Sequence, residues 1–188
     1  MKDYNIIKNK LGYLEIDPKP TESELEKHYK DKYYQQGSGC YSQEYSKDEL
    51  SFFENQAKVC EATINEHVND KTLLDIGCGE GFFSKFFFEK KWDVTCVDFS
   101  NVGIKNHNPQ LLNQFQQNNI FSFLSAAVKN NLKYGLINLD NVLEHVLDPV
   151  TLLQAIMQIM TKNSIVRIEV PNDFSAFQKL LTHLECTT

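Results

Sequence analysis

Three glycines at alternate positions, Gly77, Gly79 and Gly81, follow an apolar run that ends around Asp75. A glycine turn at the carboxyl end of a strand lets a ligand approach the backbone, and the helix after it presents free N–H groups and a partial positive charge. Asp98 closes the next apolar run and could accept hydrogen bonds from both hydroxyls of a ribose. These residues predict a site for a ligand that contains a nucleoside.

The spacing of the glycines argues against a dinucleotide ligand. A dinucleotide-binding turn needs its third glycine one position later, where this chain has Phe82. Adenosine without a pyrophosphate fits this spacing better. A dehydrogenase that uses a nicotinamide cofactor is the alternative, and binding of NAD(H) would distinguish it.

Two segments before residue 70 have the pattern of helices. Thr21 and Glu24 have the spacing of a capping box and predict a helix that begins near Glu22. Ser46 and Glu49 repeat this pattern ahead of a longer helix. Its apolar residues recur at intervals of three and four and predict one buried face: Leu50, Phe53, Ala57, Cys60, Ile64 and Val68.

After residue 70, short apolar runs alternate with helical patterns. The runs at 72–77, 92–100, 113–119, 134–142 and 164–170 predict five strands. Helical crossovers between them predict an α/β fold with a doubly wound, mostly parallel sheet and helices on both faces. Asp148 and Pro149 suit the start of the helix before the last strand. We expect residues 1–69 to form an extended segment and a helical cap, and residues 70–188 to form the core, as one compact unit with the cap.

The composition argues against several classes of function. The chain has 188 residues, a net charge of −6 and no long run of Lys or Arg, which disfavours nucleic acid as a partner. The five cysteines contain no Cys-x-x-Cys pair, so neither a disulfide framework nor a zinc knuckle is indicated. No segment has the apolar length of a signal peptide core or a membrane span, so we expect a cytoplasmic protein.

The sequence resembles the class I S-adenosylmethionine-dependent methyltransferases, in which a strand ending D-x-G-x-G-x-G precedes an acid that closes strand two. The segments "LLDIGCGEG" and "VDFS" match both features. The segments "LINLDNVLEHVLDPVTLL" and "VRIEVPNDFS" resemble the family's fourth strand with its active-site segment and the fifth strand. The segment "LGYLEIDPKPTESELEKHYKDKYY" is similar to bacterial members linked to sugar and surface-polysaccharide pathways. The resemblance implies a Rossmann-like methyltransferase fold that transfers a methyl group from S-adenosyl-L-methionine to a small-molecule acceptor, with S-adenosyl-L-homocysteine as product.

The resemblance also implies which residues hold the cofactor. The glycine turn would line its methionine part, Asp75 would order the turn, and Asp98 would hold the ribose. Asn119, at the end of the third strand, would pair with the adenine through its amide. For Asp75 and Asp98 the alternative is a local role in capping or bracing the turn.

The segment Asp140–Val142, which contains Asn141, would lie along the sulfonium side of the cofactor. This resemblance places Glu144 and His145 close to the acceptor, where either could act as a general base. Both could instead bond neighbouring backbone. Some metal-dependent RNA methyltransferases have E-x-x-E-H here, but this chain has Asn141 in place of the first glutamate, so we expect no metal.

Aromatic residues beside the expected site have two interpretations. Tyr41 and Tyr45 could close over the pocket from the N-terminal cap, or they could be ordinary packing residues. The cluster in the helix after the glycine turn is expected to belong to the core: Phe82, Phe83, Phe86, Phe87 and Phe88.

The end of the sequence raises a separate expectation. Methyltransferases of this class follow strand five with a further helix and an antiparallel strand pair, whereas here only "PNDFSAFQKLLTHLECTT" remains. We therefore expect five strands in the order 3-2-1-4-5 and a fifth strand with an exposed edge that could pair with a second copy. One alternative function is a C-terminally truncated cofactor-binding protein with little transferase activity of its own.

Overall fold

The computed structural model describes residues 5–21, 23–25, 44–172 and 175, and the chain divides into two units, Met1–Glu44 and Tyr45–Thr188. In the first unit, strands β1 (Asn5–Lys8) and β2 (Leu14–Asp17) form an antiparallel hairpin. The side chain of Asn9 closes the turn, because its Oδ1 accepts hydrogen bonds from the N–H groups of Leu11 and Gly12. The sequence pattern does not indicate this hairpin, since each strand has only four residues.

The first predicted capping box is present. The N–H of Glu24 donates to Thr21 Oγ1 at 3.3 Å, and the N–H of Thr21 donates to Glu24 Oε2 at 2.9 Å. Residues 23–25 are helical. Glu22, where the helix was expected to begin, and Tyr41 lie outside the described residues.

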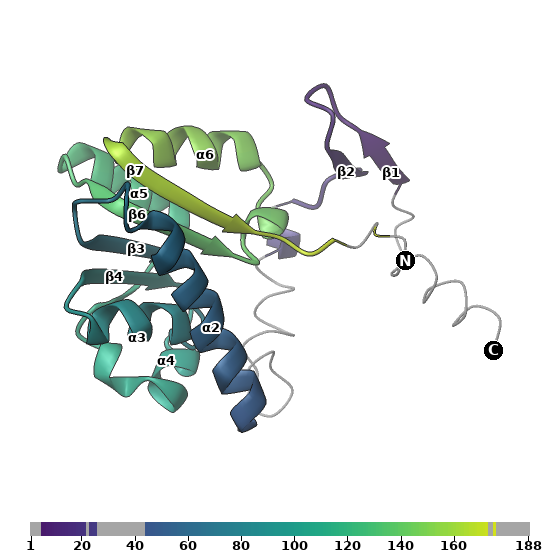
Figure 1. Cartoon of the computed structure of the whole chain (residues 1–188). Coiled ribbons are helices and arrows are strands. Elements are labelled where there is room, and N and C mark those ends of the chain that lie inside the picture. Colours follow the sequence, from purple (N-terminus) through teal and green to yellow (C-terminus); the bar gives the residue numbers. More distant parts are fainter. Residues whose placement is uncertain (1–4, 22, 26–43, 173–174, 176–188) are drawn as a thin grey trace. The chain divides into compact units, whose positions relative to one another are not determined.

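The second unit contains a parallel sheet with the order β5-β4-β3-β6-β7 (Figure 1). This confirms the predicted order 3-2-1-4-5, counted along the chain within the unit. The five strands are β3 (Thr72–Ile76), β4 (Asp93–Asp98), β5 (Phe115–Gln117), β6 (Tyr134–Asp140) and β7 (Met160–Glu169). Every neighbouring pair is parallel, so the carboxyl ends of all five strands lie at one edge of the sheet.

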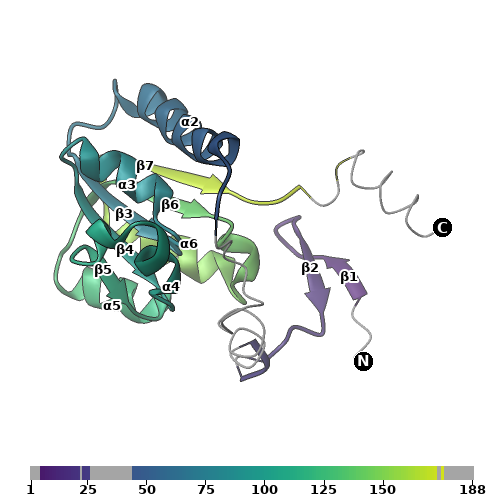
Figure 2. The ribbon, with the colours of Figure 1, turned by 90° about the horizontal axis from the view of Figure 1, so that it is seen from below.

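Helices cover both faces of this sheet, as predicted. They are α2 (Lys47–Ile64), α3 (Phe82–Glu89), α4 (Val102–His107), α5 (Ile120–Lys129) and α6 (Pro149–Gln158). Buried residues of α2, α3 and α4 pack with Leu73 and Leu136 on one face. Those of α5 and α6 pack with Leu74 and Ile137 on the other. Figure 2 shows α2 and α3 on one side of the strands and α5 on the other.

The longest helix, α2, confirms the second capping box and most of the predicted buried face. The N–H of Glu49 donates to Ser46 Oγ, and the N–H of Ser46 donates to Glu49 Oε2. Ala57, Cys60 and Ile64 are buried. Leu50 was expected to be buried but is 41% exposed, because the helix extends past the body it covers at that end. Val68 is buried although it lies beyond the helix.

The phenylalanines of α3 belong largely to the core, as predicted. Phe87 is fully buried and its ring meets those of Phe83, Phe86 and Trp92. In the described part of the chain, no helix combines the length and apolar character that a bilayer crossing requires.

Candidate functional site

The glycine turn joins β3 to α3 at the carboxyl edge of the sheet, where the sequence predicts it. Gly77, Gly79 and Gly81 all have positive φ, at 68°, 53° and 77°. Side chains strain a backbone in this region, so the conformation of the turn depends on the glycines. The N–H of Gly77 donates to the carbonyl of Val97 at 2.8 Å, which fixes the turn against β4.

Asp98 ends β4 and holds the middle of this turn. Its Oδ2 accepts a hydrogen bond from the N–H of Gly79 at 3.0 Å, and its Oδ1 accepts one from the N–H of Ser100 at 3.0 Å. Burial raises the pKa of Asp98, and these N–H groups oppose that rise. A carboxylate has about four acceptor positions, so Asp98 can brace the turn and still accept hydroxyl groups from a ligand.

Helix α4 approaches the same turn through Gly103, a contact that sequence reasoning missed. A Cβ at Gly103 would lie 2.6 Å from the carbonyl oxygen of Gly79 and 3.0 Å from the backbone N of Glu80. No side chain could move aside, since both atoms belong to the backbone. A glycine in a short helix three residues after "DFS" was the available signal.

Asp75 lies beneath the turn and is only 2% exposed. Its Oδ2 accepts a hydrogen bond from Ser84 Oγ at 2.6 Å, and its Oδ1 accepts one from Asn138 Nδ2 at 2.7 Å. It therefore connects β3 to α3 and β6 and braces the turn from below. Burial raises the pKa of Asp75 to about 6, although both hydrogen bonds act in the opposite direction.

The raised pKa of Asp75 predicts a specific pH dependence of stability. Because the folded protein holds this proton more tightly than the unfolded chain, the contribution of Asp75 is full below its ordinary pKa of 3.8. It is lost as the pH rises to about 6. Urea unfolding of the wild type and Asp75→Asn between pH 4 and pH 7 measures this, because subtraction cancels the other carboxylates. The difference, wild type minus variant, should fall with rising pH. A flat difference would contradict the prediction.

The segment after β6 packs directly against the glycine turn. A Cβ at Gly77 would lie 2.4 Å from Val142 Cγ2, so the two segments touch. Asn141 has φ of 52°, and its N–H donates to the carbonyl of Glu169 at 3.0 Å. Its Nδ2 donates to Asp140 Oδ1 at 3.0 Å. The structure thus brings the predicted segment Asp140–Val142 beside the turn.

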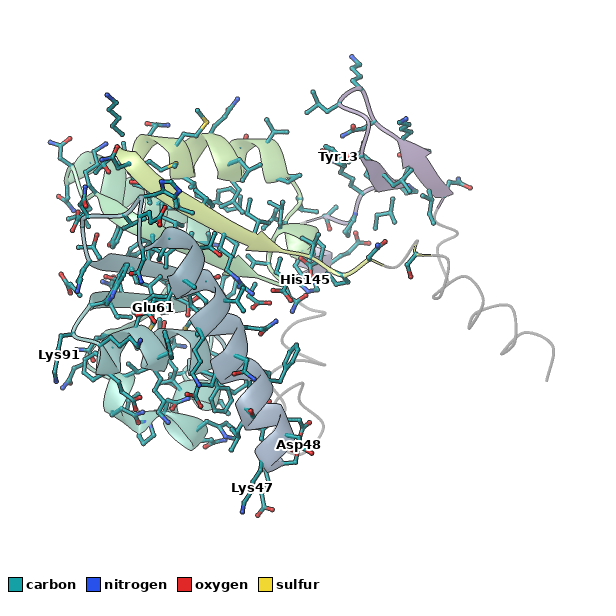
Figure 3. All side chains as sticks on the ribbon, in the orientation of Figure 1. Tyr13, Lys47, Asp48, Glu61, Lys91 and His145 are labelled. Carbon is teal, nitrogen blue, oxygen red and sulfur yellow. The ribbon has the colours of Figure 1, made fainter. Side chains whose placement is uncertain are left out.

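Glu144 and His145 lie in the short helix η3 (Leu143–His145) at the same edge of the sheet. His145 Nε2 is 3.7 Å from Glu144 Oε1, and their side chains are 44% and 27% exposed respectively. Figure 3 shows His145 beside the arrowheads of β6 and β7, and Lys91 at the opposite end of the sheet. Both side chains can reach a molecule that comes from solvent.

Asn119 and Tyr45 make contacts that sequence reasoning left open. Asn119 caps α5, because its Oδ1 accepts hydrogen bonds from Phe121 and Ser122, while its amide Nδ2 can still donate to a ligand. Tyr45 OH donates to Glu80 in the glycine turn. The Tyr45 ring also meets three other rings at 5.1–5.3 Å: those of Phe53, Phe82 and His107.

Within residues 5–21, 23–25, 44–172 and 175, no three His, Cys, Asp or Glu side chains form a group that could hold a metal ion. The carboxyl edge of the sheet carries a glycine turn, a carboxylate bonded to that turn and the start of α3. These features define a Rossmann-like α/β protein, with a candidate site for a nucleoside-containing ligand at the carboxyl ends of its strands.

Comparison with known proteins identifies the family. Residues 49–187 match the methyltransferase domain family, and the chain belongs to that family. The resemblance seen in the sequence is thereby confirmed.

Individual relatives are distant. The chain is 30% identical over 91 residues to a ubiquinone biosynthesis O-methyltransferase from Nitrosomonas europaea, a match that covers 47% of this chain and 38% of that protein. A SAM-dependent methyltransferase from Archaeoglobus fulgidus has a similar fold, with a TM-score of 0.54 and 22% identity over 72% of this chain and 60% of that one. The plantazolicin methyltransferase BpumL, solved with a pentazolic analogue and SAH, has a TM-score of 0.50 and 23% identity over 71% and 55% of the two chains. The chain thus spans less than two thirds of the length of each of these relatives, from 38% to 60%.

Proposed function

We propose that this protein is an S-adenosylmethionine-dependent methyltransferase that acts on a small-molecule acceptor. The observation that carries the proposal is the glycine turn with three positive φ angles, tied by the Gly79 N–H to Asp98. Membership of the methyltransferase domain family supports it, as do the SAM-dependent enzyme and the SAH complex among the proteins of similar fold. Sugar-linked acceptors are the first class to test.

The residues present fit this cofactor. Asp98 would accept the ribose hydroxyls, the glycine turn would admit the methionine part close to its backbone, and Asn119 would donate to the adenine. When bound, S-adenosylmethionine supplies a methyl group that its positive sulfur already activates. The chain then needs mainly to orient the acceptor and exclude water. Segment 140–142 would form the wall beside the cofactor.

Proton removal from the acceptor is the one catalytic step that a side chain would perform. Glu144 and His145 are the candidates, because both lie at the strand ends and are open to solvent. An oxygen or nitrogen acceptor needs such a base within hydrogen-bond reach. His145 is our first choice, because its side chain is 44% exposed against 27% for Glu144 and an imidazole nitrogen can accept a proton.

Isothermal titration calorimetry with S-adenosylhomocysteine and with NADH tests the proposal directly. We expect binding of the first and none of the second, with an affinity that a chelator leaves unchanged. Turnover is then measured with hydroxylated and sugar-linked acceptors. Binding of NADH instead would replace the proposal with a dehydrogenase.

A second candidate function is cofactor binding with little transferase activity by the chain alone. It is favoured by the edge of the sheet, where β7 pairs only with β6 among the described residues. A groove of about 570 Å³ lies beside that edge, between α2 and β7. Binding of S-adenosylhomocysteine without turnover on any acceptor would favour this candidate.

We also propose that a second copy of the chain covers this edge. Phe52 and Val59, which line this groove, are 58% and 67% exposed, and exposed apolar side chains that gather in one place mark an interaction surface. An edge strand pairs with another edge strand, and each copy supplies one of the same length. Antiparallel pairing about a two-fold axis would place the two α2 helices on the same face.

Val59→Lys tests this arrangement. Because Val59 projects from α2 into the groove, a charge there should oppose burial against a second copy without disturbing the fold. We expect the wild type to sediment as a dimer and this variant as a monomer at the same concentration. Met157→Lys is the matched control, since Met157 is 69% exposed on α6. A wild type that is monomeric at high concentration would contradict the proposal.

The protein is proposed to be cytoplasmic. The three described cysteines, Cys60, Cys78 and Cys96, are all free, which suits a reducing compartment.

A further inference from the structure

A row of polar side chains crosses the interior of the sheet at one level. The strand register makes Cys96, Asp75, Asn138 and Arg167 successive neighbours on β4, β3, β6 and β7. Asp75, Cys96 and Asn138 are at most 2% exposed. Since buried strands in such sheets are usually apolar throughout, a polar row is costly unless its members satisfy one another.

Hydrogen bonds connect the row without a gap from α3 to the edge strand. Ser84 Oγ donates to Asp75, Asn138 Nδ2 donates to Asp75 at 2.7 Å, and Arg167 Nη1 donates to Asn138 Oδ1 at 2.7 Å. Asp75, Asn138 and Arg167 are thus each bonded to the neighbouring element, and Cys96 Sγ donates to Ser84 Oγ at 3.2 Å. The row lies below the glycine turn and ends at Arg167.

Arg167 connects this row to the other half of the site. Its Nη1 also donates to Asp140 Oδ2 at 3.0 Å, and its Nη2 donates to Glu169. Asp140 is the residue at which β6 ends and the segment beside the glycine turn begins. The Arg167 side chain is 16% exposed and its guanidinium lies 5.0 Å from the centre of the Phe83 ring. Packing and hydrogen bonds together fix its position.

The turn that Arg167 borders needs such support. Asn141 has a left-handed φ of 52°, a conformation that surrounding contacts must stabilise in a residue other than glycine. Two contacts from β7 do so: the ion pair from Arg167 to Asp140, and the hydrogen bond from the Asn141 N–H to the carbonyl of Glu169. Val142, one residue further, packs on Gly77.

We infer that Arg167 is a positioning residue, which sets the turn at 140–142 through Asp140 and the base of the glycine turn through Asn138 and Asp75. The two walls of the proposed cofactor site then hold their relative placement, because one guanidinium bonds to Asp140 in the first wall and is connected to the base of the second through Asn138 and Asp75. The expected effect on cofactor binding rests on the proposed function. The positioning of the two walls by Arg167 is a property of the ligand-free protein and does not depend on it.

The positive charge of Arg167 makes the network depend on this one residue. Arg167 bonds to Asp140 and Glu169, so a neutral residue would leave these two carboxylates with no cation bonded to them among the described residues. Lysine would keep the charge but lacks the planar fork that reaches Asn138, Asp140 and Glu169 together.

Hydrogen–deuterium exchange of the ligand-free protein tests the inference in the variant Arg167→Gln. We expect faster exchange at residues 140–145 and 77–83 than in the rest of the sheet, and Arg167→Lys should fall between this variant and the wild type. Calorimetry on the same proteins should show S-adenosylhomocysteine bound roughly three- to thirtyfold more weakly by Arg167→Gln.

Ser164→Ala is the matched control on the same strand. Ser164 Oγ donates to the carbonyl of Tyr134 at 2.6 Å, at the start of β6 and away from the carboxyl edge of the sheet, so this variant should leave exchange at both segments unchanged. Asp140→Asn weakens the same ion pair and replaces Arg167→Gln if that variant does not fold. Uniform acceleration across the sheet, or equal local effects in Ser164→Ala, would overturn the inference. If the wild type binds no S-adenosylhomocysteine, the proposed function fails while exchange still decides the role of Arg167.

Discussion

Asp98→Ala should weaken binding of S-adenosylhomocysteine by roughly tenfold to a hundredfold, because hydrogen bonds to a charged group contribute about 1.5–3 kcal/mol. Two losses combine at this position. The variant removes the proposed acceptor for the ribose hydroxyls, and it leaves the N–H groups of Gly79 and Ser100 without the oxygen that holds them. The middle of the turn would therefore lose its attachment to residue 98 together with the proposed ligand contact, while Gly77 stays bonded to Val97.

Asp98→Asn separates these two losses. An amide has one acceptor oxygen, so it can keep one of the two backbone hydrogen bonds but loses the charge. Its affinity should lie between those of the wild type and Asp98→Ala. Asp93→Asn is the control, since Asp93 is an exposed carboxylate at the opposite end of β4. Calorimetric affinities for Asp98→Ala that match the wild type would remove Asp98 from the site.

Gly103→Ala should distort the site, although it adds only one methyl group. The added methyl group would lie 2.6 Å from the carbonyl oxygen of Gly79, so either α4 or the glycine turn must move. Overpacking of this kind costs about 1–3 kcal/mol of stability. Because the displaced residue is the one that bonds to Asp98, we expect affinity for S-adenosylhomocysteine to fall at least about tenfold as well.

Gly135→Ala is the matched control, because it adds the same methyl group against backbone atoms at a place remote from the site. Its methyl group would lie 2.0 Å from the carbonyl oxygen of Asp70, at the amino-terminal end of the sheet. It should lower the free energy of unfolding by at least as much as Gly103→Ala, yet leave the affinity of the folded protein unchanged. Urea unfolding and calorimetry on both variants measure this contrast. Equal losses of affinity would show that Gly103 acts only through global stability.

Much of the core could be predicted from the sequence because its patterns are local. The alternation of apolar runs and helical segments predicts the five strands, and the known handedness of crossovers limits the order in which they pair. The glycine turn and Asp75 lie within seven consecutive residues, so a strand followed by a helix is enough to place them. Ser46 and Asp148 also act through neighbours three residues away.

The contacts that join the two walls of the site were decided by the tertiary structure. Asn138 and Asp75 are 63 residues apart, and Gly103 meets Gly79 through backbone atoms. A polar residue in the apolar run at 134–142 signals a buried partner but does not identify it. Local sequence sets which residues share a strand, while strand register and the close approach of helices set which residues touch. The sequence by itself therefore determined the fold and the place of the glycine turn, and only the packing of the sheet placed Arg167 where it bonds to both Asn138 and Asp140.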